Sequence, residues 1–515
     1  MKKKFCNLIF IVLFSALFTI SFLTPLGWIF AYNGFTEIAT YFVAFAFFMW
    51  LFHTIFNSLL KYNPNFESVR TSSCRILIYA LPCIIIWSFY LIAFFPGVMT
   101  SDSLGQWGEM LTGKYVDANP VVHTFFIYLI TRIWFSPAAI AISQILILST
   151  TFAYGMYTLE KAGVTKKIIY TAVALFSLYP VNGILSITLW KDVLFSSFIL
   201  LFTILLINII LDKNWINKIG HKALFILTGL GVMLLRHNGI VSFIGTVIIL
   251  MWLFRKNIRP YAICITIIII AYILIKGPVY QMANVKPGSP SEAFGIPIQQ
   301  ISAVIRYNGK ITDSQLKEID NIMPAYLWGK NYVPTNVDYV KFSPEFKREE
   351  ISKNKLKFIK LWSEICIQNP EIVTTAYFDQ TKSIWQIREQ GTINRGSRKI
   401  DDNSYGLKQT VISKPITLIA NITLSVIGQP ILVWFFWKPA IPMFIIIFTV
   451  YTAFAKGFKL IPLVLLPVFL NIATLLLAVP AQDFRYLYSN ALTVFVIAIF
   501  SLINLDENGS NFKLN

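Results

Sequence analysis

The sequence predicts an all-α protein that crosses a membrane many times, and three observations support this. Of the 515 residues, 56% are hydrophobic and only 13% are charged. The apolar residues are gathered in runs of about twenty, the length that an α-helix needs to cross a bilayer. Lys and Arg total 44 against 25 for Asp and Glu, and such an excess is typical of the cytoplasmic loops of membrane proteins. A water-soluble enzyme is therefore excluded, and the basic excess is not interpreted as a nucleic-acid surface.

About twelve segments have the length and composition of membrane spans. Each must bond its own backbone N–H and C=O groups, because the bilayer core holds no water. The predicted spans cover residues 7–31, 35–60, 76–95, 138–159, 168–189, 193–211, 222–235, 239–254, 260–275, 430–455, 460–479 and 486–503. The first run follows three lysines and is predicted to remain as an uncleaved helix, since it is too long for the apolar part of a signal peptide.

The basic residues of alternate loops predict the orientation of the chain. With a cytoplasmic N-terminus, every inner loop contains Lys or Arg, for example Lys61, Lys166 and Arg255. We therefore expect both termini to be cytoplasmic, in a plasma (inner) membrane. This orientation requires that residues 119–134 and 412–428 lie at the outer surface as amphipathic helices.

The chain is predicted to have three parts. Residues 1–275 form an N-terminal transmembrane module with a first extracytoplasmic loop at 96–137, residues 276–410 form an extracytoplasmic domain, and residues 411–515 form a C-terminal transmembrane module. The mixture of charges, Pro and aromatic residues in the middle part predicts a mostly helical cover over the outer surface.

Ionisable residues at membrane depth are costly, so those at the outer corners are functional candidates. Asp102 follows a Pro-Gly turn. It is either a carboxylate that favours the start of a helix or a catalytic base. Asp117 and His123 follow in the same loop, and a single His at an interface is more often structural than a metal ligand. Asp102, Asp192 and His123 are nevertheless candidate ligands for a divalent cation such as Mg²⁺ or Mn²⁺.

Three further corners on the same predicted face carry charges of both signs. Each corner alone is explained by a snorkelling cation or a carboxylate at a helix start. Together they would bind a phosphate at the membrane surface, because a guanidinium can bind phosphate through two hydrogen bonds. The sequence therefore predicts transfer from a lipid phosphate with Asp102 as the base. The predicted substrate-binding residues are Asp117, Lys191, Asp192, Arg236, His237, Asp483 and Arg485.

These motifs resemble those of the GT-C superfamily of integral membrane glycosyltransferases, whose signature is an acidic residue in the first long extracytoplasmic loop. The stretch Pro96–Trp107, with Gly113–Asp117 and Asn119–Pro120 behind it, looks like that loop in a bacterial branch that more commonly has His-Pro at the last position. Trp190–Asp192 matches the second acidic motif. Other segments that look familiar from this branch are Gly295–Gln300, Tyr332–Pro334 with Asp338 and Lys341, Asn369–Pro370 and Phe484–Tyr486.

The resemblance implies a GT-C-like bundle, a donor such as an undecaprenyl-phosphate sugar, and a cell-envelope glycopolymer or glycolipid as acceptor. It also implies Asp102 as the base. In the polar domain, four side chains could touch sugar but are interpreted as packing and surface residues, namely Gln299, Gln300, Trp385 and Arg388.

Two alternatives stand beside a membrane glycosyltransferase. A polysaccharide polymerase would depend on loop arginines more than on Asp102. A flippase or transporter for a lipid-linked or anionic substrate would need charges along a path near the middle of the bilayer. The predicted charges lie mainly at the outer ends of helices, which favours the transferase. The expected partners are the lipid bilayer, the lipid-linked donor and the acceptor, and no nucleic acid.

Overall fold

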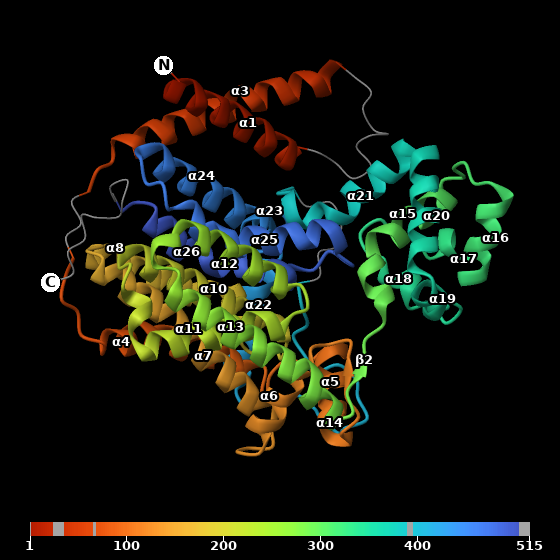
Figure 1. Cartoon of the computed structure of the whole chain (residues 1–515), viewed down its shortest axis with the longest axis horizontal. Coiled ribbons are helices and arrows are strands. Elements are labelled where there is room, and N and C mark those ends of the chain that lie inside the picture. Colours follow the sequence, from red (N-terminus) through yellow and green to blue (C-terminus); the bar gives the residue numbers. More distant parts are fainter. Residues whose placement is uncertain (1, 24–34, 65–67, 389–394, 504–515) are drawn as a thin grey trace.

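The computed structural model describes residues 2–23, 35–64, 68–388 and 395–503. Within these ranges the chain is built of helices and one two-stranded parallel sheet (Figure 1). The strands are β1 (Val116–Asp117) and β2 (Lys286–Pro287), with Val116 opposite Lys286. The predicted all-α class is therefore confirmed for the described residues, with this small sheet as an addition.

Six of the described helices are long and apolar enough to cross a membrane. They are α1 (Lys2–Leu23), α3 (Phe35–Lys61), α4 (Arg75–Ala93), α7 (Pro137–Lys161), α10 (Lys191–Leu211) and α13 (Arg259–Leu274), which continues through η3 (Ile275–Val279) into α14 (Tyr280–Met282). Two bent pairs would bring the number to eight: α8 (Lys166–Leu178) with α9 (Pro180–Ser186), bent by 58°, and α22 (Lys414–Val426) with α23 (Pro430–Phe436), bent by 93°. These helices are compatible with a multi-pass membrane protein.

The other predicted spans are shorter helices in the structure, so twelve crossings are not established. They are α11 (Ile219–Leu235), α12 (Gly239–Leu253), α24 (Ala440–Lys456), α25 (Pro462–Ala478) and η5 (Phe484–Leu487) with α26 (Tyr488–Phe500). A helix of 17 residues, such as α11, is about 26 Å long, which is less than the roughly 30 Å of a hydrocarbon core.

Proline explains two of these differences. The predicted span 430–455 is divided between α23 and α24 near Pro439, and the predicted span 168–189 bends at Pro180. Proline has no N–H to donate to the preceding turn, so a helix ends or bends there. Positions 24–31 of the predicted span 7–31 lie outside the described residues.

Helix α10 is the centre of the main bundle. In an apolar stretch of 18 residues of α10, 83% of the residues are buried, whereas none is buried in the corresponding stretch of α3. Helix α10 packs against α7, α11, α25 and α26. Helices α1 and α3 lie together along one edge of the bundle and contact α24 (Figure 1). The remaining short helices near the bundle are α5 (Ser101–Thr112), α6 (Val121–Thr131), η1 (Trp215–Asn217) and η2 (Arg255–Asn257).

A second unit of short helices, which we call the polar unit, lies beside the bundle (Figure 1). It consists of η4 (Pro290–Phe294), α15 (Gly295–Arg306), α16 (Asp313–Ile322), α17 (Ala325–Lys330), α18 (Asp338–Lys341), α19 (Arg348–Lys353) and α20 (Lys355–Gln368). Ile301, Trp328 and Phe358 belong to a hydrophobic core separate from that of the bundle. Helix α21 (Pro370–Trp385) leads from this unit back to α24 and α25. The middle of the chain is thus mostly helical, as predicted.

Backbone hydrogen bonds fix the polar unit to a corner of the bundle. Val337 N–H donates to Pro480 O at 3.0 Å, and Gln482 N–H donates to Thr335 O at 3.1 Å. An antiparallel bridge joins Asn336 to Ala481 between them. This contact holds the polar unit directly beside the turn that carries Asp483 and Arg485.

Candidate active site

Helix ends bring the predicted charged residues to one place. Asp102 is the second residue of α5, Lys191 and Asp192 are the first two residues of α10, and Arg236 follows the last residue of α11. Arg485 lies in η5, between α25 and α26. Because each of these residues stands where an apolar helix begins or ends, its side chain can be charged without interrupting a span.

Two extended segments hold the first loop against the start of α10. Val98 N–H donates to Ile187 O at 3.0 Å, and Leu189 N–H donates to Val98 O at 3.0 Å. The Ser103 hydroxyl donates to Leu189 O at 2.7 Å. These bonds place the N-terminus of α5 beside that of α10, although about ninety residues separate them in the sequence.

Asp102 forms ion pairs with two cations. Arg485 Nη1 lies 2.7 Å from Asp102 Oδ2, and Lys191 Nζ lies 3.5 Å from the same oxygen. Lys191 also donates to Asn119 Oδ1. The Asp102 side chain is 32% exposed and the two cations are 15% exposed each, so the group is partly open to solvent.

Three carboxylates and three cations form what we call the corner cluster. Arg236 Nη1 lies 3.3 Å from Asp192 Oδ1, and Arg485 Nη1 lies 4.0 Å from Asp192 Oδ2. Arg485 Nε lies 3.0 Å from Asp483 Oδ2. The members are Asp102, Asp192, Asp483, Lys191, Arg236 and Arg485.

Asp192 is buried but incompletely bonded. Its side chain is 1% exposed, and neither carboxylate oxygen has a hydrogen-bond partner among the described residues. The ion pairs with Arg236 and Arg485 compensate its negative charge, which would otherwise be costly to bury.

Aromatic rings hold the two arginines. The Arg485 guanidinium lies over the rings of Trp190 and Tyr486, at 4.8 and 5.2 Å from their centroids. The Arg236 guanidinium lies over the same Tyr486 ring, 5.1 Å from its centroid. Trp190 is itself fixed by a 2.8 Å hydrogen bond from Nε1 to Thr100 Oγ1. Stacking covers the faces of both guanidinium groups, so their edges point to the carboxylate and carbonyl oxygens that they bind.

The ion pairs set the protonation states of two carboxyl groups. Burial alone would raise the pKa of Asp102, but the charges and hydrogen bonds of Lys191 and Arg485 outweigh it and lower this pKa to about 2. Burial raises the pKa of Asp483 to about 6, although Arg485 acts in the opposite direction. At neutral pH, Asp102 is therefore an ionised but weakly basic carboxylate while its two cations are in place.

Asp117 and His237 belong to a neighbouring contact rather than to the corner cluster. Lys276 Nζ lies 2.6 Å from Asp117 Oδ2, and the Tyr280 hydroxyl donates to Oδ1 at 3.4 Å. His237 Nε2 lies 3.1 Å from the backbone oxygen of Asp117. This contact ties the first loop to α13, η3 and α14. Lys276 and Tyr280 were not predicted as site residues, and the only sequence signal was a Lys directly after an apolar span.

His123 is a buried neutral residue beside the site. It is fully buried in α6, and its Nδ1 lies 2.8 Å from Gln106 Oε1. Burial, followed by the charge of Lys191, lowers its pKa to about 3. Its Nε2 has no hydrogen-bond partner among the described residues.

The candidate metal ligands face cations. Within the parts of the chain that the structure describes, no group of three or more His, Cys, Asp or Glu residues could hold a metal ion. Asp102 and Asp192 both face Arg485 Nη1, at 2.7 and 4.0 Å. A guanidinium between two carboxylates disfavours a divalent cation there in this arrangement.

The polar unit brings a second charged group towards the corner cluster. Lys341 Nζ lies 3.4 Å from Asp338 Oδ1 and 2.5 Å from Glu292 Oε2. Burial raises the pKa of Asp338, and Lys341 and, more weakly, Arg485 oppose this.

The four polar-domain side chains that could have touched sugar have structural partners instead. Gln299 donates to Val333 O, and Gln300 donates to Val373 O. The other two also bond within the protein, with Trp385 Nε1 donating to Thr381 Oγ1 and Arg388 Nη1 donating to Leu23 O. The packing interpretation therefore holds for the two glutamines, which are buried.

One comparison with known proteins gives a match. A family model described as a family of unknown function (DUF6020) matches residues 134–511. The matched region contains every cation of the corner cluster and begins after Asp102. No curated protein and no solved structure is significantly similar to the chain.

Proposed function

Because residues 134–511 are well over half of its length, the chain belongs to the DUF6020 family, whose function is unknown, and we propose its activity from the corner cluster. The protein is a membrane glycosyltransferase of the GT-C type. It moves a sugar from a polyprenyl-phosphate donor to a glycopolymer or glycolipid of the cell envelope. The observation that carries this proposal is that Lys191 and Arg485 both form ion pairs with Asp102, while Arg236 forms one with the neighbouring Asp192.

The cations provide the donor site. A polyprenyl phosphate keeps its chain in the lipid and its phosphate at the surface, where the helix ends of the corner cluster lie. Lys191, Arg236 and Arg485 bind the phosphate oxygens, and the N-terminus of α10 adds its partial positive charge. As the bond to the sugar breaks, these groups stabilise the charge that develops on the leaving phosphate.

Donor binding also activates the base. In the free protein, Lys191 and Arg485 hold the pKa of Asp102 at about 2, which makes it a poor proton acceptor. A donor phosphate competes with Asp102 for both cations, so the pKa of Asp102 rises when the donor is bound. The carboxylate is then a competent base only when the leaving group is in place.

The transfer step follows from these positions. Asp102 takes the proton from an acceptor hydroxyl, and the oxygen of that hydroxyl bonds to the anomeric carbon of the sugar. The bond between this carbon and the phosphate oxygen breaks, and its electron pair stays on the phosphate. Asp192 and Asp483 hold Arg236 and Arg485 in position for the phosphate, and the polar unit, which is fixed beside the turn that carries Arg485, covers the acceptor side.

The position of the charges favours an enzyme over a transporter or flippase. The cluster is formed at helix ends and in the corners between helices. A transport path would place such charges within the spans. The role of Asp102 likewise favours a transferase over a polysaccharide polymerase that depends mainly on loop arginines.

The donor site is tested by binding of undecaprenyl phosphate to the purified protein in detergent micelles. We expect Lys191→Ala and Arg236→Ala each to weaken binding by about 10- to 100-fold, the effect of losing one charged hydrogen bond. The matched control is Lys114→Ala, because Lys114 is an exposed cation of the first loop and does not belong to the corner cluster. Unchanged affinity in both test variants would exclude the corner cluster as the phosphate site.

The proposed topology has twelve crossings, cytoplasmic termini and the corner cluster on the outer side of a plasma (inner) membrane. Single cysteines at Asp402 and Lys166, both exposed, test it by labelling intact cells with a membrane-impermeant maleimide. We expect Asp402→Cys to be labelled and Lys166→Cys to react only after the membrane is opened. The wild-type chain gives the background from its own cysteines, of which Cys6 and Cys74 are exposed. The reverse pattern would place the site in the cytoplasm.

A further inference from the structure

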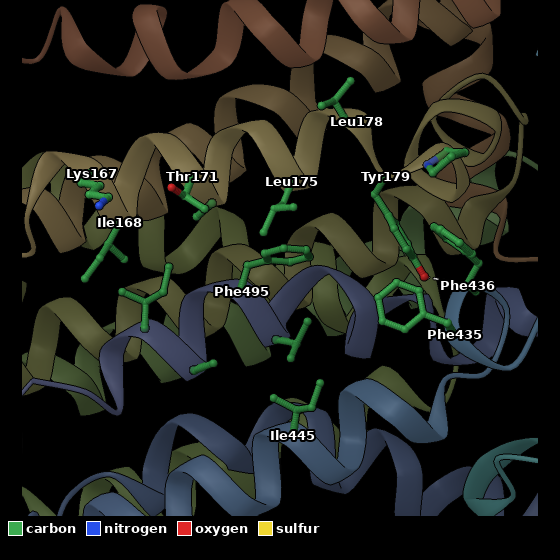
Figure 2. A pocket seen from close by; sticks show the side chains of 15 residues that line it. Lys167, Ile168, Thr171, Leu175, Leu178, Tyr179, Phe435, Phe436, Ile445 and Phe495 are labelled. Atoms are coloured by element: carbon green, nitrogen blue, oxygen red, sulfur yellow. Dashed lines mark hydrogen bonds between the residues drawn. The ribbon is translucent and has the colours of Figure 1, made fainter. Parts of the chain in front are cut away.

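An apolar groove runs along the outside of the bundle, and its described lining includes no residue of the corner cluster. It has a volume of about 750 Å³, within the range of roughly 300–1,000 Å³ that is usual for ligand sites. Its walls come from α8, α9, α23, α24 and α26. Figure 2 shows Leu175 and Phe495 facing each other across its middle and Ile445 below them.

The two ends of the groove differ in chemistry. Lys167 lies at one end and is the only charged residue that lines it among those the structure describes. The other end is formed by Tyr179, Phe435 and Phe436 (Figure 2). The Tyr179 hydroxyl donates to Phe436 O at 2.5 Å and is therefore bonded within the protein. The groove thus offers a cation at one end and only apolar surface at the other.

The length of the groove matches one leaflet of a bilayer. From Lys167 to Leu178 along α8 the rise is about 16 Å, about half of the roughly 30 Å hydrocarbon core. The groove is open along its side, since Leu175 is 58% and Leu178 is 63% exposed. A hydrocarbon chain that enters beside Lys167 would therefore end near Tyr179 and Phe436.

The bilayer around the groove determines which kind of molecule fills it. Within a bilayer, a groove with almost no polar surface is filled by lipid chains, because water is excluded from the core. A second protein segment gains no hydrophobic free energy by replacing those chains. The single cation at the entrance is complementary to a negative headgroup.

We infer that this groove binds one acyl chain of an anionic glycerophospholipid, with the headgroup phosphate at Lys167. The site is separate from the corner cluster and does not depend on the proposed transferase activity. Lys167 lies in a loop that the sequence predicts to be cytoplasmic, and the cytoplasmic leaflet is the one rich in anionic lipid.

Photo-crosslinking tests this site directly. The full-length protein is reconstituted in phosphatidylcholine vesicles that contain phosphatidylglycerol with a diazirine on its acyl chain. In the wild type we expect the label in peptides that contain residues 171–180 and 494–499. Labelling confined to other segments would overturn the proposal without any need for a variant.

Two pairs of variants test the chain and the headgroup separately. Ala498→Trp fills the groove from α26 and should lower labelling of residues 171–180 to background. Ala174→Trp is its control, because Ala174 is exposed on α8 and does not line the groove. Lys167→Gln should reduce the preference for phosphatidylglycerol over phosphatidylcholine by about fivefold, the effect of one cation near an anionic lipid, and Lys166→Gln should not.

Three results would contradict the inference. Equal labelling of Ala498→Trp and Ala174→Trp would show that the chain lies elsewhere. An unchanged headgroup preference in Lys167→Gln would exclude an anionic lipid as the occupant of the groove. Displacement of the label by undecaprenyl phosphate but not by excess phosphatidylglycerol would assign the groove to a polyprenyl chain instead.

Discussion

Asp102→Asn should abolish sugar transfer while the protein keeps its fold and its affinity for the donor phosphate. Asn has the shape of Asp but cannot accept a proton at neutral pH, and loss of a general base typically lowers the rate by about 10²- to 10⁴-fold. The substitution also removes the carboxylate that competes with phosphate for Lys191 and Arg485. We therefore expect undecaprenyl phosphate to bind the variant as tightly as the wild type, or more tightly.

This combination separates Asp102 from the cations. Loss of a cation weakens donor binding, whereas loss of the base stops transfer after the donor has bound. The readout is the sugar composition of the cell envelope in cells that lack the protein and are supplied with either variant or with the wild type. Asp402→Asn is the matched control, since Asp402 is an exposed carboxylate in the segment that follows the polar unit.

Two outcomes would contradict the proposed role. Normal envelope sugars in cells with Asp102→Asn would show that Asp102 is not the base. An envelope whose sugars are unchanged when the protein is absent would show that the protein is not the proposed transferase. A defect that also appears in Asp402→Asn would point to insertion or abundance, which blotting of the membrane fraction measures.

The sequence was sufficient to predict the corner cluster because membrane proteins restrict where charges can stand. A charged residue inside a span is costly, so the ends of apolar runs identify Lys191, Asp192, Arg236 and Arg485 as residues at a surface. Alternation of basic loops then predicts which of those ends share a face. The structure brings these four residues together with Asp102, as the sequence analysis expected.

The pairing within the cluster could not be predicted in the same way. The distinction between Asp102, which is held by Lys191 and Arg485, and Asp117, which is held by Lys276, depends on the turn at Pro96–Thr100 and on the short sheet β1–β2. Such contacts join segments that are distant in the sequence, and no local pattern specifies them.

The number of membrane crossings does not follow from the apolar runs alone, for a related reason. Apolar runs such as 222–235 and 239–254 predict burial, but burial can be in lipid or in protein. In α11 and α12 one face is buried against α10 or its neighbours, and these helices have 17 and 15 residues, fewer than the roughly 20 of a typical span. The apolar groove was also invisible in the sequence, because its lining comes from α8, α23, α24 and α26 together.

Arg485→Ala should destabilise the protein more than any other single substitution in the corner cluster. Arg485 is the shared partner of Asp102, Asp192 and Asp483, and the last two carboxylates are 1% and 3% exposed. Removal of one partner from a buried ion pair costs about 3–5 kcal/mol, because the remaining charge is buried without compensation. We expect a clear fall in melting temperature in detergent micelles, and no such fall for Arg132→Ala, which removes an exposed arginine.

The pH dependence of this loss identifies its source. Burial raises the pKa of Asp483 from its ordinary 3.8 to about 6, so between these values the folded state binds more protons than the unfolded state. Stability from this group therefore falls as the pH rises through that window. Without Arg485 the pKa of Asp483 rises further, and the window extends to higher pH. The melting temperature of Arg485→Ala should therefore be closer to that of the wild type at pH 5 than at pH 8.

A second substitution makes the argument specific to Asp483. Adding Asp483→Asn to Arg485→Ala removes the buried charge, so it should restore part of the lost melting temperature at pH 8 and little at pH 5. The hydrogen bond from Arg485 N–H to Asp483 Oδ1, at 3.0 Å, is one that an Asn side-chain oxygen can still accept. If the double variant melts no higher than Arg485→Ala at pH 8, loss of the ion pair between Arg485 and Asp483 is not the cause. The loss would then come from Asp192, whose two oxygens already lack hydrogen bonds in the described chain.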